Sequence, residues 1–151
     1  MHKKIILSFL LILLGSCASY EAIYKGSEKK ILINRIELGN KNLISYRIKN
    51  NLSRYVSNKK DAENSYKIEF LADKKILITS KDGRGNAKTF ELTVTVKLTA
   101  IKNNAQYKKT FNKSFSYQNN SNKFNLRSYE KNITSNMINE ITSEIVNYLA
   151  S

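Results

Sequence analysis

Few residues of this chain could do acid–base, nucleophilic or metal chemistry. Among its 151 residues there is one histidine, His2, and one cysteine, Cys17, and both stand near the start. Histidine-dependent triads and Cys/His metal sites need such side chains inside the folded domain. The 12 Asp and Glu residues are scattered, and no pair stands in a recognisable general acid–base motif. We therefore expect a protein that is not an enzyme and that needs no metal or cofactor.

The glycines of Asp82-Gly83-Arg84-Gly85 fit either a phosphate-binding loop or a hairpin turn. A phosphate-binding loop leads from a strand into a helix, whereas this stretch joins two extended segments. Glycine also supplies the positive φ that tight turns need. The sequence therefore predicts a hairpin turn at this position.

The first 16 residues have the pattern of a secretory signal. A basic segment, His2-Lys3-Lys4, precedes an apolar run from Ile5 to Leu14. This run is shorter than the ~20 residues of a membrane-spanning helix and is typical of a signal-peptide core. We expect residues 1–16 to be removed, residues 17–30 to form a tether, and residues 31–151 to form a single domain.

The end of this segment, Leu14-Gly15-Ser16-Cys17, resembles the lipobox of bacterial lipoproteins. The resemblance implies that the peptide is cut before Cys17 and that this cysteine is lipidated on its thiol and its amine. Two or more acyl chains give a lasting membrane anchor. Ala18 stands where an Asp would favour retention in the inner membrane, so the resemblance implies the periplasmic side of the outer membrane. An ordinary secretory signal with a free thiol is the alternative.

The chain is strongly basic, with a formal net charge of +14. Loss of Lys3 and Lys4 with the signal leaves 24 basic and 12 acidic residues, a net charge of +12. A basic exported protein can bind anionic lipid, lipopolysaccharide or another anionic envelope polymer. Nucleic acid is not an expected partner in that compartment. A composition rich in Lys, Asn and Ile is also what A/T-rich coding produces, so the charge has two explanations.

One stretch, Phe90–Ala100 (FELTVTVKLTA), must position any binding residues. Its even-numbered positions are apolar and its odd-numbered positions are polar, which predicts a strand with one buried face. Threonine at most of the polar positions favours the same backbone. The polar face is either solvated or a surface for phosphate or sugar groups. The candidate ligand-binding residues are those that add positive charge to this strand and its preceding turn: Arg84, Lys88 and Lys97.

Periodicity places the other elements around this strand. We predict a strand at 31–38, a helix at 41–57 capped by Asn40, an edge strand at 107–117 and a helix at 128–150. Residues 65–80 form either one long strand that Ala72 and Lys74 disturb in its middle or two short strands joined at 72–75, and we favour one long strand. The order β-α-β-β-β-α predicts an α+β two-layer sandwich, with a mostly antiparallel four-stranded sheet and both helices on one face. The pattern leaves the position of the first strand in the sheet open.

Two turns fix the register. A turn near Arg84 sets Ile78 opposite Phe90 and Ile68 opposite Ala100, and a two-residue turn at Asn103-Asn104 sets Tyr107 opposite Ala100. The apolar residues of all three long strands then share one face. Lys109 and Lys113 interrupt that face on the last strand, which is typical of an edge strand guarded against pairing.

The whole pattern resembles the lipopolysaccharide-assembly lipoprotein family, LptE. The matching features are the lipobox, the first strand and helix, a Tyr-x-Ile-x-Phe strand at 66–70, the turn with Arg84, the alternating strand, Phe115-Ser116-Tyr117 and the long final helix. They cover nearly the whole chain, but as loose patterns. The Lys/Asn bias and the shortage of Ala in the last helix depart from the family.

The resemblance implies an outer-membrane lipoprotein that plugs a large β-barrel partner, LptD, assists its assembly and binds lipopolysaccharide through basic residues. No motif carries those residues over one by one, so Arg84, Lys88 and Lys97 are candidates from charge and face alone. A free-standing envelope lipoprotein that binds anionic lipid or polymer without a barrel partner is the main alternative. A structural subunit of another envelope complex is the third.

Overall fold

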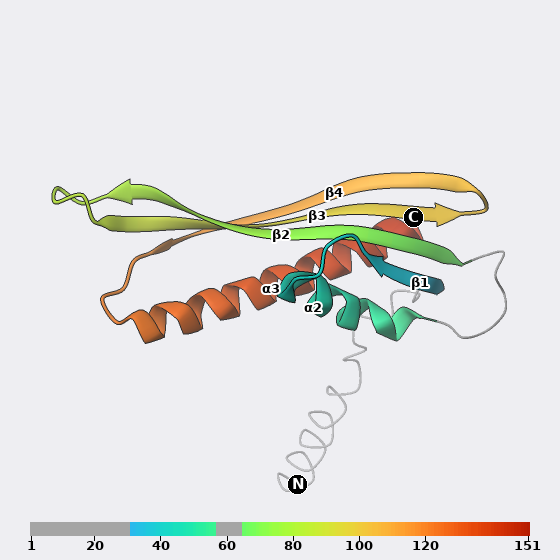
Figure 1. Cartoon of the computed structure of the whole chain (residues 1–151), viewed down its shortest axis with the longest axis horizontal. Helices are drawn as coiled ribbons and strands as arrows, with labels where there is room; N and C mark the ends of the chain where they lie inside the picture. The colour runs from blue at the N-terminus through green and yellow to red at the C-terminus, as the bar shows by residue number, and fades with distance from the viewer. Residues whose placement is uncertain (1–30, 57–64) are drawn as a thin grey trace, which may run out of the picture.

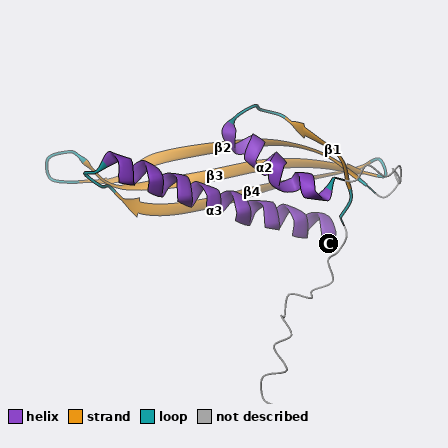
Figure 2. Ribbon diagram, turned by 90° about the horizontal axis from the view of Figure 1, so that it is seen from below, coloured by secondary structure: helices purple, strands orange, loops and turns teal. Residues whose placement is uncertain are grey.

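The computed structural model describes residues 31–56 and 65–151. Four strands form one sheet in the order β1-β2-β3-β4, in which β1 is parallel to β2 and the other neighbours are antiparallel. Helices α2 and α3 lie together on one face of this sheet (Figures 1 and 2). The elements are β1 (Ile33–Leu38), α2 (Leu43–Leu52), the 3₁₀ turn η2 (Ser53–Tyr55), β2 (Tyr66–Lys81), β3 (Ala87–Lys102), β4 (Ala105–Gln118) and α3 (Lys123–Ala150).

This arrangement confirms the predicted α+β sandwich and its β-α-β-β-β-α order. It also places the first strand, which lies at the sheet edge beside β2. The signal segment, the tether and Cys17 lie outside the described residues.

The strand around which the fold was predicted is β3, and it lies between β2 and β4. Its even-numbered residues from Leu92 to Ala100 are buried, whereas the odd-numbered residues between them remain partly or fully exposed. Both registers are confirmed, with Ile78 opposite Phe90, Ile68 opposite Ala100 and Tyr107 opposite Ala100. The two-residue turn is also confirmed, because Asn103 and Asn104 have φ angles of 50° and 60°, which asparagine tolerates better than most residues.

The predicted cap of the first helix is wrong by two residues. The N-cap of α2 is Asn42, whose side chain accepts a hydrogen bond from the backbone N–H of Ser45 at 2.9 Å. Asn40 instead lies beside β2 as a continuation of β1, because the preceding Gly39 still donates its backbone N–H to the carbonyl of Phe70. The helix ends at Leu52 and continues only as η2, where the prediction extended to Ser57.

The last helix begins five residues earlier than predicted, at Lys123 instead of Ser128. Asn122 caps it by accepting hydrogen bonds from the backbone N–H groups of Phe124 and Asn125. In this first part of the helix Leu126 is the buried residue, so the sequence shows no apolar stripe there. From Ile133 onward the stripe that predicted the helix is buried against the sheet.

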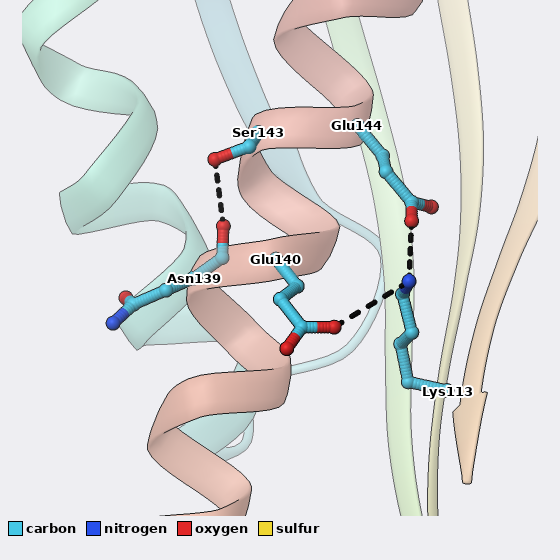
Figure 3. Close-up of polar contacts among 5 residues, drawn as sticks. All are labelled: Lys113, Asn139, Glu140, Ser143 and Glu144. Atoms are coloured by element: carbon cyan, nitrogen blue, oxygen red, sulfur yellow. Dashed lines mark hydrogen bonds and ion pairs between the residues drawn. The ribbon is translucent and has the colours of Figure 1, made fainter.

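The lysines of β4 attach this edge strand to α3. The ammonium of Lys113 lies 2.5 Å from a carboxylate oxygen of Glu144 and 3.4 Å from one of Glu140 (Figure 3). The hydrogen bond to Glu144 and the nearby charge of both glutamates raise the pKa of Lys113. Lys109 lies over the ring of Tyr148, with its nitrogen 4.6 Å from the ring centroid. The predicted edge position is confirmed, and both lysines on its inner face contact the helix.

Candidate functional site

Three segments meet at the end of the sheet farthest from β1 (Figure 1). They are the first residues of β3, which follow the turn from β2; the loop between β4 and α3; and the first turn of α3. Asn119 joins them: its backbone N–H donates to the carbonyl of Lys88 at 2.9 Å and its side-chain amide donates to the carbonyl of Ala87 at 2.7 Å. The amide oxygen of Asn119 accepts a hydrogen bond from the ammonium of Lys123 at 2.8 Å. Lys88 and Lys123 therefore flank the same asparagine.

This end of the molecule carries a group of cations that we call the hairpin-end cluster: Arg84, Lys88, Lys123 and Arg127. In residues 31–56 and 65–151, no ion pair reaches any of these four side chains. The turn and the first turns of the helix each contain one carboxylate, and neither forms an ion pair with these cations. Asp82 accepts hydrogen bonds within its own turn, and Glu130 accepts one from Tyr117. The four cations outnumber these two carboxylates, so this end of the molecule has a net positive charge.

The turn that presents Arg84 is held by Asp82. One carboxylate oxygen of Asp82 accepts from the backbone N–H groups of Arg84 and Asn86, at 2.9 and 2.8 Å, and the other accepts from the Asn86 side chain at 3.1 Å. Gly85 supplies the positive φ of +83° that closes the turn. The Asn86 side chain, followed by its backbone N–H, lowers the pKa of Asp82 below its ordinary value of 3.8.

Protonation of Asp82, or its replacement by alanine, is therefore expected to loosen this turn. Because the folded pKa is the lower one, the carboxylate contributes stability to the turn above pH 3.8 and loses it as the pH falls through the folded value. Hydrogen exchange of the Arg84 and Asn86 amides should accelerate in Asp82→Ala, with little change elsewhere. Unchanged exchange at both amides would show that the glycines alone hold the turn.

Tyr117 fixes the start of α3 on the sheet. Its ring stacks on Phe90 with the centroids 5.5 Å apart and meets the edge of the Tyr129 ring at 6.1 Å. Its hydroxyl donates to the carboxylate of Glu130 at 2.6 Å. Burial, and then the hydrogen bond to Glu130, raises the pKa of Tyr117 far above its ordinary value of 10.0. The protonated phenol therefore holds the Glu130 carboxylate against Tyr117.

Exposed apolar side chains accompany the cations at this end. Phe124, in the first turn of α3, is 80% exposed, which is far more than a packing role requires. Ile78, Phe115 and Tyr129 are each about half exposed. Cationic groups next to exposed apolar surface suit a ligand that combines anionic groups with acyl chains.

Two of the three predicted ligand residues lie at the same end of the sheet. Arg84 and Lys88 lie at the hairpin end, but Lys97 lies nine residues further along β3, which is about 30 Å in an extended strand, and on the outer face of the sheet. There it stands between Leu71 and Thr110. With Glu69 and Lys108 it lines an open depression of about 400 Å³.

The threonine-rich outer face, which the sequence offered as a surface for phosphate or sugar, makes many of its own hydrogen bonds. Thr93 pairs with Ser114 and Thr95 with Asn112, both at 2.8 Å, so these side chains have a structural use. The charges of this face nearly balance. Its basic residues on β2, β3 and β4 are Lys67, Lys75, Lys97 and Lys108, and its acidic residues are Glu69, Asp73 and Glu91.

Sequence reasoning missed Lys123 and Arg127. Both precede the helix that was predicted at 128–150, where the apolar stripe begins. The signal that could have placed them is Asn122, a residue type that favours the N-cap position. An earlier helix start would have predicted two cations on successive turns of the same helix.

The described part of the chain contains no group of three or more His, Cys, Asp or Glu side chains that could hold a metal ion. No helix within the described residues is long and apolar enough to cross a membrane.

Comparison with solved structures shows that bacterial lipoproteins share this fold. No protein-family model matches the sequence, and a search of curated proteins finds no match. Among solved structures, rare lipoprotein B from Shewanella oneidensis is similar, with 14% identity, a TM-score of 0.61, and 78% of this chain and 94% of that chain covered. Lipoprotein B from Nitrosomonas europaea is similar with 16% identity, a TM-score of 0.59, and coverage of 81% and 85%. A lipoprotein from Caulobacter crescentus has 17% identity, a TM-score of 0.52, and coverage of 76% and 87%.

Proposed function

We propose that this protein is a non-enzymatic lipoprotein of the outer membrane, anchored on its periplasmic side through Cys17, and that it works as LptE-family proteins do. In this role it assists the assembly of an LptD-like β-barrel, plugs that barrel and binds lipopolysaccharide. The observation that carries the proposal is the hairpin-end cluster: cations that form no ion pair among the described residues, beside exposed apolar side chains. The fold shared with lipoproteins of Gram-negative bacteria supports it.

The chemistry of the cluster fits lipopolysaccharide. Its lipid portion carries phosphate groups on acylated sugars. Arg84 and Arg127 can bind phosphate through two parallel hydrogen bonds, and Lys88 and Lys123 contribute point charges. Phe124 and Ile78 supply the apolar contact that acyl chains require. Binding of this kind makes and breaks no covalent bond.

The lipid anchor has a direct test. Cys17→Ser removes the thiol that would carry acyl chains, so the variant should move from the membrane fraction to the soluble fraction after cell lysis. The measurement is the share of protein in each fraction, with Ser19→Ala as a matched control that should stay membrane-bound. A Cys17→Ser variant that remains in the membrane fraction would contradict anchoring through this residue.

The barrel partner is tested by affinity purification from detergent-solubilised membranes. The proposal predicts that a large β-barrel protein is recovered in a stoichiometric amount with the full chain. Recovery of the chain alone would reject a barrel partner. If such a preparation still bound lipopolysaccharide, the free-standing envelope lipoprotein that binds anionic lipid would be the correct description.

A further inference from the structure

Strand β2 is much longer than its parallel neighbour. β1 pairs with it from Tyr66 to Phe70, whereas β2 continues to Lys81. At Ala72, the next residue whose backbone groups point away from β3, side chains take the place of a neighbouring strand. The Asn40 amide donates to the carbonyl of Ala72 at 2.7 Å and its oxygen accepts from the Ala72 N–H at 3.0 Å, while Asn42 also donates to that carbonyl. The edge of β2 is therefore closed as far as Ala72.

Beyond Ala72 the edge is open. At Phe70 and Ala72 the backbone groups point away from β3, in the plane of the sheet. Because a strand alternates with a period of two, the N–H and C=O groups of Lys74, Ile76 and Ile78 also point away from β3. In the described part of the chain no strand pairs with them on this side. An irregularity in the register between Ile78 and Ser80 then ends the regular edge. We call the segment from Asp73 to Ile78 the open edge.

The side chains of the open edge divide into two kinds. Ile76, Leu77 and Ile78 are between about one third and one half exposed, and they occupy both faces of the strand. Lys74 and Lys75 are exposed, and among the residues described no ion pair reaches either ammonium. A neighbour would therefore gain backbone hydrogen bonds, apolar contact and two unpaired cations.

A second copy of the chain does not suit this edge. Pairing two copies would bring Lys74 and Lys75 of each onto one short ladder, with only the Asp73 residues to offset them. Lysine on an exposed edge is a common means of preventing such self-pairing. The charges instead favour a strand that brings carboxylates of its own.

We propose that the open edge binds an extended segment of another protein as an added β-strand. That segment carries carboxylates opposite Lys74 and Lys75 and apolar residues opposite Ile76, Leu77 and Ile78. Backbone hydrogen bonds provide the affinity in this mode of recognition, and alternate side chains provide the specificity. The inference stands whether or not the protein plugs a barrel. The open edge contains none of the four cations of the hairpin-end cluster and shares only Ile78 with the apolar surface beside them.

The test uses the full chain in detergent micelles and a synthetic peptide, acetyl-Ser-Ile-Val-Val-Glu-Glu-Thr-amide. In antiparallel orientation its glutamates face Lys75 and Lys74. A saturating concentration should slow hydrogen exchange of the Lys74, Ile76 and Ile78 amides at least ~10-fold, and the same peptide with lysines in place of glutamates should not. Unchanged exchange would overturn the proposal. Slow exchange of these amides before peptide is added would also overturn it, because another copy or another part of the chain would then cover the edge.

Two variants at one position separate backbone pairing from apolar contact. Ile76→Pro removes an outward N–H and leaves the hydrogen bonds between β2 and β3 in place, as proline allows on an edge. Ile76→Pro should lower the affinity for the peptide at least ~10-fold. Ile76→Thr keeps the N–H, so its affinity should fall less than about 3-fold. Circular dichroism confirms that both variants fold. Equal losses in the two variants would reject strand addition.

Discussion

Replacing Ile141 with alanine is expected to lower the free energy of unfolding by about 2–5 kcal/mol, the range seen when a buried aliphatic side chain is truncated. Ile141 is 0% exposed and lies in the C-terminal half of α3, in the same buried cluster as Leu92 and Val94 of β3. The variant would leave a cavity at the centre of the contact between helix and sheet. Chemical denaturation of wild type and variant gives the difference.

The matched control is Leu43→Ala on α2. Leu43 is 65% exposed, so its truncation should change stability by no more than about 0.5 kcal/mol. A small loss at Ile141, or equal losses at the two positions, would contradict the two-layer core in which α3 covers β3.

Reversing the charge of the hairpin-end cluster is expected to weaken lipopolysaccharide binding at least ~100-fold. The variant replaces Lys88, Lys123 and Arg127 with glutamate. Each basic residue near an anionic lipid surface contributes about 1 kcal/mol, so the loss of three attractions alone corresponds to that factor. Titration of fluorescently labelled lipopolysaccharide measures the affinity, and thermal unfolding checks that the fold is retained.

A second triple variant separates the site from the overall charge. Replacing Lys67, Lys97 and Lys108 with glutamate changes the net charge by the same amount, on the outer face of the sheet. We expect the affinity of this variant for lipopolysaccharide to fall less than about 10-fold, mainly through long-range electrostatics. Equal losses in the two variants would mean that binding follows net charge and that the cluster is not the site.

The three long strands could be predicted from the sequence because each has a period of two and consecutive ones are joined by a short turn. In β3 that period separates Val94 from Thr95 without ambiguity, and parity then sets the pairing across both turns. The same logic identified β2 as one long strand despite Ala72 and Lys74. Ala72 is buried where Asn40 and Asn42 bind its backbone, whereas Lys74 lies where the edge is open and a charged residue is solvated.

The candidate site could be predicted only in part, because it depends on contacts distant in sequence. Nothing local to Lys123 indicates that Asn119 binds the backbone of Ala87 and Lys88 and thereby brings two cations together. Lys97 has the residue type that a binding role requires, yet nine residues of strand separate it from Lys88. The choice of Asn42 over Asn40 as the helix cap likewise depends on where β2 lies.

The most direct test of the account is to locate bound lipopolysaccharide on the protein in cells. A photoreactive benzoylphenylalanine in place of Phe124, an aromatic residue that is 80% exposed at the hairpin end, should form an adduct with lipopolysaccharide on irradiation. The same group in place of Leu43, an exposed residue at the start of α2, should form none. An adduct at position 124 alone is the result that the account predicts. No adduct at position 124, or equal yields at the two positions, would contradict it.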